Sequence, residues 1–156
     1  PGFVLGPDTY GNAGTSLKTI KAMMRGKISK APKIAYPVVD VRDCANIHVA
    51  AMTVKEAGGR RLLATSDTLW LREYAEIIRE AYPSLNKLPT GELSNWVVRA
   101  TSLFNEGARG LVGSLGVFHE ADNAYVEDLT GIKCRPAREA VLASAKSLVK
   151  SGKVKV

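Results

Sequence analysis

The strongest constraint on the fold is an alternation of short apolar runs with helical patterns across residues 1–82. The apolar runs, each bounded by glycine, proline or polar residues, lie at residues 1–7, 38–41 and 60–65. The helical patterns lie at residues 17–25, at 44–57, and from 67 or 68 to 82. Strands that alternate with helices predict part of a parallel α/β sheet, although three short strands are too few for a complete doubly wound sheet.

The second part of the chain has a mostly helical pattern. Helices are expected at residues 93–104, 122–129 and 136–150, with a glycine-rich connector at 107–116. The sequence therefore predicts a division into residues 1–82, with strands and helices, and residues 83–156, which are mostly helical.

The net charge of +7 is concentrated in the sequence near the C-terminus. Residues 132–156 hold seven basic residues against one acidic residue, Glu139. A basic stretch of this kind is typical of a solvated helix face with a basic end. No aromatic residue interleaves with the charges, which argues against stacking on single-stranded nucleic acid, so a nucleic-acid partner is not expected.

Several classes of protein are disfavoured by composition. The longest nearly apolar stretch, residues 48–54, is far short of the roughly 20 residues of a membrane span. No signal-peptide pattern opens the chain, which begins at Pro1 without a methionine, so further residues are expected upstream. The two cysteines, Cys44 and Cys134, form neither a disulfide framework nor a zinc motif, and indicate a reducing compartment, the cytoplasm.

No complete catalytic constellation is found in the sequence. The glycines at 107, 110 and 113 have a dinucleotide-like spacing, but they follow a helical pattern and not a strand, which favours a connector. His48 and His119 lack partners at metal-ligand spacing, so no metal site is expected. None of the five tyrosines has a lysine four residues later, so no catalytic residue of the Tyr/Lys type is predicted in this chain.

The order of the motifs nevertheless resembles a known family. The segments Pro1-Gly-Phe-Val-Leu-Gly-Pro7, Thr15-Ser16-Leu17, Val39-Asp-Val-Arg-Asp-Cys-Ala45 and Leu129-Thr-Gly-Ile-Lys-Cys-Arg-Pro136 resemble extended short-chain dehydrogenase/reductases, dihydroflavonol 4-reductase and cinnamoyl-CoA reductase-like enzymes in particular. The resemblance is to the C-terminal half. It implies an incomplete Rossmann-like domain at residues 1–82 and a substrate-side lobe with a terminal helix at residues 83–156.

The resemblance also implies a cofactor and the residues that contact it. The cofactor is NADP, with NAD as the alternative, and its binding is incomplete in this chain. Pro1, Phe3 and Val4 match the strand beside the nicotinamide, and Ser16 matches a pyrophosphate contact at a helix start. Tyr36 lies where the family lines its substrate pocket. The glycine-rich loop and the Tyr/Lys pair of the family would lie upstream of Pro1.

Three other groups of residues have more than one interpretation. Asp43 is interpreted as a helix N-cap, and Arg42 as a partner for a nearby acid. Trp96, Phe104 and Phe118 could line the substrate pocket, but a place in the core is favoured.

The sequence therefore predicts the C-terminal portion of an NAD(P)-dependent reductase of a ketone or aldehyde, inactive alone. The alternatives are a sugar-nucleotide epimerase of the same superfamily and a non-catalytic dinucleotide-binding sensor or scaffold. The expected partners are a small carbonyl substrate and either the missing N-terminal half or a second copy of the chain, without a membrane.

Overall fold

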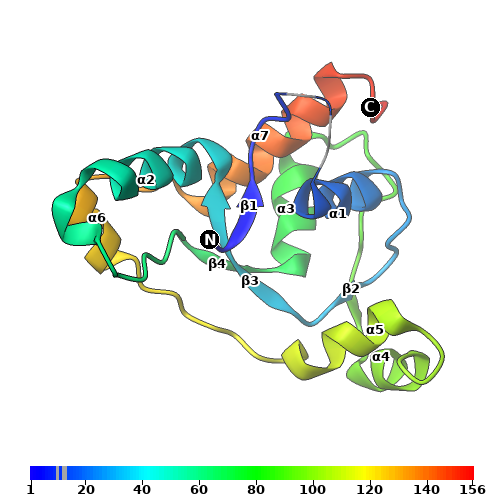
Figure 1. Ribbon diagram of the computed structural model, residues 1–156. Helices are drawn as coiled ribbons and strands as arrows, with labels where there is room; N and C mark the ends of the chain where they lie inside the picture. Colours follow the sequence, from blue (N-terminus) through cyan, green and yellow to red (C-terminus); the bar gives the residue numbers. More distant parts are fainter. Residues whose placement is uncertain (10, 12–13) are drawn as a thin grey trace.

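A computed structural model describes residues 1–9, 11 and 14–156 (Figure 1). In the described residues the main sheet has three strands, in the order β1 (Phe3–Leu5), β3 (Ala35–Asp40) and β4 (Thr68–Trp70). β1 runs parallel to β3, with Phe3 opposite Val38, whereas β4 runs antiparallel to β3, with Ala35 opposite Trp70. Helices surround this small sheet, which confirms the predicted α/β class.

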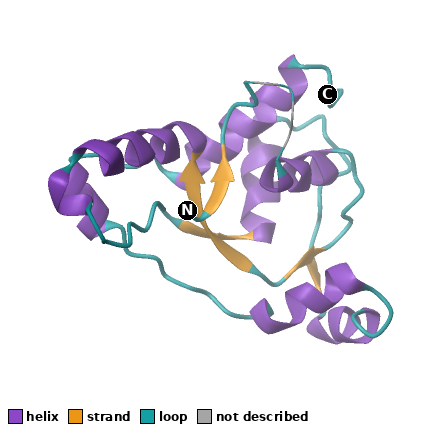
Figure 2. Cartoon of the chain, viewed as in Figure 1, coloured by secondary structure: helices purple, strands orange, loops and turns teal. Residues whose placement is uncertain are grey.

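A second sheet lies apart from the first one (Figure 2). Its strands β2 (Ala31–Pro32) and β5 (Glu92–Leu93) pair in parallel. The short helices α4 (Asn95–Thr101) and α5 (Glu106–Leu111) follow β5, together with the 3-10 turn η2 (Val112–Ser114). Figure 1 shows α4 and α5 as a small lobe at the lower right, away from the main sheet.

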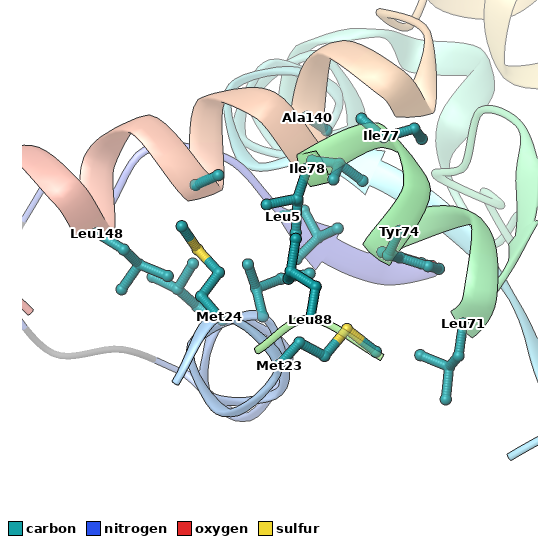
Figure 3. Packing of buried hydrophobic residues seen from close by; sticks show 14 of the residues in the cluster. Leu5, Met23, Met24, Leu71, Tyr74, Ile77, Ile78, Leu88, Ala140 and Leu148 are labelled. Atoms are coloured by element: carbon teal, nitrogen blue, oxygen red, sulfur yellow. The ribbon is translucent and has the colours of Figure 1, made fainter. Parts of the chain in front are cut away.

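The helices pack on the main sheet in two groups, because neighbouring side chains of a strand point to opposite faces. Val38 packs among residues of α1 (Thr15–Met24), α3 (Leu71–Ala81) and α7 (Ala137–Lys150), whereas Val39 packs against α2 (Val41–Thr53) and α6 (Ala124–Thr130). β1 alternates in the same way, with Leu5 in the first cluster and Val4 beside the second. Figure 3 shows the first and larger cluster, where Leu5, Met24, Tyr74 and Leu148 converge from β1, α1, α3 and α7.

Two glycines allow β1 to lie close to its neighbours. A Cβ atom on Gly2 would lie 2.3 Å from the Pro37 carbonyl oxygen, and one on Gly6 would lie 2.8 Å from Val41 Cγ1. Gly6 also has a φ of +134°, which side chains disfavour. Glycine is therefore required at both ends of β1.

The expected strand at residues 60–65 is wrong. The backbone there is irregular, and Leu63 is exposed, while Thr65 is buried and donates its hydroxyl to the Val38 carbonyl. Backbone bonds link Ser66 and Asp67 to Val38, and regular pairing with the sheet begins at β4, which occupies the position expected for the start of a helix. α3 begins after it at Leu71, because the Glu73 carboxylate accepts a hydrogen bond from the Trp70 backbone N–H at 2.7 Å.

The glycine-rich region at residues 107–116 is more regular than expected. It forms most of α5 and η2, and Asn105 caps α5 by accepting a hydrogen bond from the Ala108 N–H at 3.1 Å. The helix was missed because glycine disfavours helix interiors. As expected, the segment follows a helix and not a strand, so it lacks the arrangement of a dinucleotide-binding turn.

Other boundaries differ by a few residues. β3 begins at Ala35, α2 begins at Val41 and ends before the 3-10 turn η1 (Lys55–Ala57), and the pattern at 93–104 yields only β5 and α4. α6 ends at Gly131 with a φ of +68°, and Pro136 precedes α7, as expected. The expected loop at 8–14 contains residues 10, 12 and 13, which lie outside the described residues.

The helix α7 has 14 residues, which is short compared with a membrane span. A bilayer span needs about 20 residues. Across the described residues, no helix combines the length and the apolar character needed to cross a membrane.

The proposed division near residue 82 stays a prediction. α7, in the second part of the sequence, packs on α1 and α3 of the first, and its residues Val141 and Leu148 are in the larger cluster.

We expect Gly6→Ala to lower the free energy of unfolding by about 2 kcal/mol, because both the backbone conformation and Val41 oppose a Cβ atom. Thermal or urea unfolding measures the change. Gly113→Ala is the matched control, since nothing lies within 4 Å of its added Cβ and its φ is not positive. Equal midpoints for the two variants would contradict the requirement at Gly6.

We also expect the outer edge of β1 to recruit another strand. Among the described strands only β3 pairs with β1, so β1 is an edge of the main sheet. Unpaired edges favour association. Light scattering across a concentration series should reveal association, and a monomer at all concentrations, without any added partner, would contradict this expectation.

Candidate functional site

A pocket of about 260 Å³ lies where β1 ends and α1 begins. It is lined by residues from both elements and from the start of α2, namely Val4, Gly6, Pro7, Asp8, Thr9, Gly14, Ser16, Leu17 and Val41. Two of the predicted cofactor residues, Val4 and Ser16, therefore line one pocket although 12 positions separate them in the sequence. We call this cavity the β1–α1 pocket.

The start of α1 supplies hydrogen-bond donors to this pocket. Gly14 is the N-cap, and among the described residues no side-chain cap bond is found at this helix start. The first backbone bond of the helix runs from the Lys18 N–H to the Gly14 carbonyl, so the N–H groups of Thr15, Ser16 and Leu17 precede the helical ladder. The helix begins two residues earlier than the pattern at residues 17–25 predicts, so it includes Thr15 and Ser16. Both belong to the first turn, where free N–H groups and the positive end of the helix dipole favour an anion.

The strand β1 presents its other face to an aromatic cluster. The rings of Phe3 and Tyr36 stack with centroids 4.9 Å apart and planes 10° apart, and Tyr74 meets Phe3 edge-on at 6.1 Å. The predicted substrate residue Tyr36 is half-buried, and burial raises its pKa. Phe3 and Tyr36 are thus brought together, but on the face of β1 opposite to the one where Val4 packs.

Tyr74 also belongs to this cluster, although the sequence predicted no role for it beyond the helical pattern that ends at residue 82. It is fully buried, and its hydroxyl has no hydrogen-bond partner among the described residues. Burial raises the pKa of Tyr74 above its ordinary value. No spacing rule could find this position, because the Phe3 ring that it meets is distant in the sequence.

Pro1 lies apart from the other predicted contacts. It is exposed, and the chain turns inward only at Gly2, whose N–H donates to the Ala64 carbonyl at 2.9 Å. A contact of Pro1 with a cofactor stays a prediction, as do the roles of the backbone N–H groups of Phe3 and Val4.

The acidic residues beside the β1–α1 pocket are structural. Asp40 is buried and caps α2 by accepting a bond from the Arg42 N–H at 2.9 Å, while the Arg42 guanidinium binds the same carboxylate at 2.7 and 2.8 Å. Burial opposes ionisation of Asp40, but the hydrogen bonds from Arg42 outweigh it and lower the pKa of this carboxyl. The predicted partner of Arg42 is confirmed, whereas the N-cap is Asp40 and not Asp43.

Asp43 instead joins α2 to the segment before α7. Its carboxylate accepts a hydrogen bond from the Arg135 N–H at 2.8 Å and pairs with the Arg135 guanidinium. The charges of Asp43 and Arg135 therefore compensate each other within the fold, and no catalytic role is assigned to this pair.

Cys44 has a neighbour on its own helix, His48, that the sequence analysis did not predict. Its Sγ lies 3.8 Å from Nδ1 of His48, one helical turn later, but that nitrogen lies closer to the Cys44 carbonyl oxygen, at 2.7 Å. Burial raises the pKa of the Cys44 thiol, which favours the unreactive protonated form. Among the described residues, no group of three or more His, Cys, Asp or Glu could hold a metal ion.

The aromatic residues expected in the core of the small lobe lie at the surface. Trp96 is 81% exposed, Phe104 is 92% exposed and Phe118 is 47% exposed. The preference for core positions is wrong here, because α4 and α5 are too short to enclose these side chains. The Phe118 ring contacts the Trp70 ring, with centroids 5.3 Å apart.

Comparisons with known proteins find similarity to reductases. No family model matches the chain. The chain is 25% identical to the NADPH-dependent methylglyoxal reductase Gre2 of Saccharomyces cerevisiae, over 96% of this chain and 42% of the relative. It is 29% identical to a ketoreductase of Aspergillus novofumigatus, over 57% of this chain and 27% of the relative. The chain thus spans well under half the length of these curated relatives.

Solved structures share the fold. The NADPH complex of yeast Gre2 superimposes with a TM-score of 0.69 and 22% identity, over 97% of this chain and 42% of that one. A nucleoside-diphosphate-sugar epimerase of Pseudomonas aeruginosa superimposes with a TM-score of 0.76 and 20% identity, over 99% of this chain and 48% of that one. These comparisons confirm the resemblance to extended short-chain dehydrogenase/reductases and the Rossmann-like character of the fold.

We expect Tyr74→Phe to stabilise the chain by about 1 kcal/mol, because it removes a buried hydroxyl without a partner and keeps the ring. Urea unfolding measures the change. Tyr125→Phe, at a half-exposed position in α6, is the control and should leave stability unchanged. Destabilisation by Tyr74→Phe would mean that the hydroxyl has a partner in the folded protein.

Proposed function

We propose that this chain is the part of an NADP-dependent carbonyl reductase that holds the pyrophosphate and nicotinamide side of the cofactor and the adjoining substrate wall. The observation that carries the proposal is the convergence of Val4 and Ser16 on the β1–α1 pocket, at a helix start without a side-chain cap. A relative that aligns with 96% of this chain is an NADPH-dependent reductase, which supports the proposal.

The β1–α1 pocket fits one portion of a dinucleotide. The Ser16 hydroxyl and the first-turn N–H groups would bind a pyrophosphate oxygen. β1 would offer backbone donors at Phe3 and Val4 to the nicotinamide carboxamide. When bound, the cofactor supplies a hydride to a carbonyl carbon.

The substrate would lie on the aromatic side of β1. Tyr36 would contact a small ketone or aldehyde, and its stacking on Phe3 holds the ring in one orientation. A tyrosine phenol is protonated at neutral pH, and burial raises the pKa of Tyr36 further, so its hydroxyl could donate a hydrogen bond to the carbonyl oxygen. The proton-donating Tyr/Lys pair of the resemblance is not present in these 156 residues, so this chain alone is proposed to be inactive.

An epimerase is the second candidate, because a nucleoside-diphosphate-sugar epimerase is among the structures with the same fold. An epimerase would regenerate its cofactor and convert a sugar nucleotide without net consumption of NADPH. A non-catalytic sensor would bind the dinucleotide and convert neither substrate. The proposed partners are a small carbonyl compound and a polypeptide that completes the sheet, and the proposed location is the cytoplasm.

NADPH binding tests the cofactor site. Titration of NADPH fluorescence should show no tight binding by the 156-residue chain, because the few hydrogen bonds available, each worth about 0.5–1.5 kcal/mol, do not offset the cost of immobilising a ligand, about 4–15 kcal/mol. Expression of the longest reading frame that contains these residues should restore binding and the reduction of methylglyoxal as a probe carbonyl.

In the longer protein we expect Ser16→Ala to weaken NADPH by about tenfold, or 1.4 kcal/mol. Thr19→Ala is the matched control, because the Thr19 hydroxyl bonds the Thr15 carbonyl of its own helix and does not line the pocket. Micromolar binding by the short chain, or equal affinities for the Ser16 and Thr19 variants, would overturn the placement of the site. Turnover of a sugar nucleotide without NADPH oxidation would favour the epimerase.

A further inference from the structure

A second concave surface lies at the other end of α1, and basic side chains dominate it. One pocket, of about 210 Å³, is lined by Ala22 and four basic residues, Lys18, Lys21, Arg25 and Lys27. A neighbouring pocket, of about 470 Å³, shares Arg25 and adds Lys87, Lys153 and Lys155. Neither pocket has an acidic lining residue. We call the surface formed by these seven basic residues the basic groove.

The fold gathers seven of the chain's 22 basic residues in the basic groove. Only two of them, Lys153 and Lys155, belong to the basic stretch at residues 132–156. The groove thus draws on three segments, since α1, the loop at Lys87 and the end of the chain meet here (Figure 1).

The fold holds these charges together. The Arg25 guanidinium donates to the Lys153 carbonyl at 2.9 Å, which fastens the C-terminal segment to the end of α1. Gly26 lies against the Lys87 side chain, because a Cβ atom at Gly26 would meet Lys87 Cβ at 2.7 Å. The three segments are therefore in direct contact, and the fold places their charged side chains close together.

These charges are largely uncompensated within the chain. Among the described residues, ion pairs within 4.0 Å involve one member of the groove, Lys153, which pairs with Asp8 at 2.6 Å. Arg25 is the main cause of a lowered pKa of Lys21, followed by burial and by Lys153 and Lys27. Repulsion between the cations thus disfavours the charged form of Lys21.

A purely structural role explains only part of this arrangement. Cations near the C-terminal end of a helix interact favourably with its dipole, which suits Lys21 and Arg25 at the end of α1. The dipole does not require Lys87, Lys153 and Lys155, which come from other segments and increase the repulsion. A bound anion would remove this repulsion.

We propose that the basic groove binds a compact soluble anion that carries three or more linked phosphate groups. Two adjoining pockets that share Arg25 suit a short chain of phosphates rather than a single one. Among the described residues no aromatic side chain lines either pocket, so these residues offer no platform for nucleic-acid bases. The groove is separate from the β1–α1 pocket, because Ser16 and Arg25 are at opposite ends of a ten-residue helix about 15 Å long.

Calorimetry of the 156-residue chain with inorganic tripolyphosphate tests the proposal. We expect saturable one-to-one binding that weakens steeply between low and physiological salt, since the contacts are ionic. Orthophosphate should bind at least about tenfold more weakly than tripolyphosphate, because it can contact fewer of the cations at once.

Charge-neutralising variants locate the site. Lys21→Gln and Lys87→Gln change one residue in each pocket, and each should weaken tripolyphosphate by about fivefold, since each removes one charge near the ligand. The control pair, Lys55→Gln and Arg60→Gln, alters exposed cations outside the groove and should bind like the parent. Circular dichroism of every variant confirms that the fold is retained.

Three results would overturn the proposal. The first is an absence of saturable tripolyphosphate binding at low salt. The second is binding of tripolyphosphate to the Lys21→Gln and Lys87→Gln variants as tightly as to the control pair. The third is binding of duplex DNA or anionic phosphatidylserine vesicles that tripolyphosphate fails to displace, which would assign the groove to a macromolecular polyanion or a membrane surface.

Discussion

The contact between Ser144 of α7 and Gly6 at the end of β1 fixes the geometry on which the rest of the structure depends. The buried Ser144 hydroxyl accepts a bond from the Gly6 N–H at 2.8 Å, across 138 positions of sequence. Its single proton lies between two acceptors, the Ala140 carbonyl of its own helix at 2.9 Å and the Gly6 carbonyl at 3.2 Å. Only a residue without a Cβ fits there, with Val41 so close. This contact sets where β1 ends and therefore where the β1–α1 pocket opens.

Carboxylates provide the other long-range links. Asp67 caps α7 by accepting the Ala137 N–H at 2.8 Å, and Asp43 binds Arg135 just before that helix. The start of α7 is thus held by residues 70 and 92 positions away. Because its small buried residues, Ala140 and Ala145, allow close packing, α7 lies tightly on α1 and α3.

Local patterns predicted the local structure, and the resemblance predicted part of the site. The apolar run at Val38 and Val39 forms a strand, Pro136 precedes a helix, and Ser16 lies at the start of another helix, as expected. The errors have non-local causes. Residues 60–65 look like a strand in composition, but the sheet takes Thr68–Trp70 as the third strand through backbone bonds to β3. The basic groove was not predictable, because Lys87 and Lys155 come together only through the tertiary fold.

α1 connects two chemically different surfaces. Its first turn presents free N–H groups to the β1–α1 pocket, and its last turn presents Lys21 and Arg25 to the basic groove. The same helix buries Leu17, Ile20, Met23 and Met24 in the larger cluster, so it cannot shift toward one surface without leaving its place in the core. The C-terminal segment is tied to both ends of this region, because Lys153 binds Asp8, which lines the β1–α1 pocket, while its carbonyl accepts from Arg25. An anion that draws on Lys153 in the basic groove would therefore compete with Asp8 for that ammonium group, which gives the two surfaces a direct physical connection.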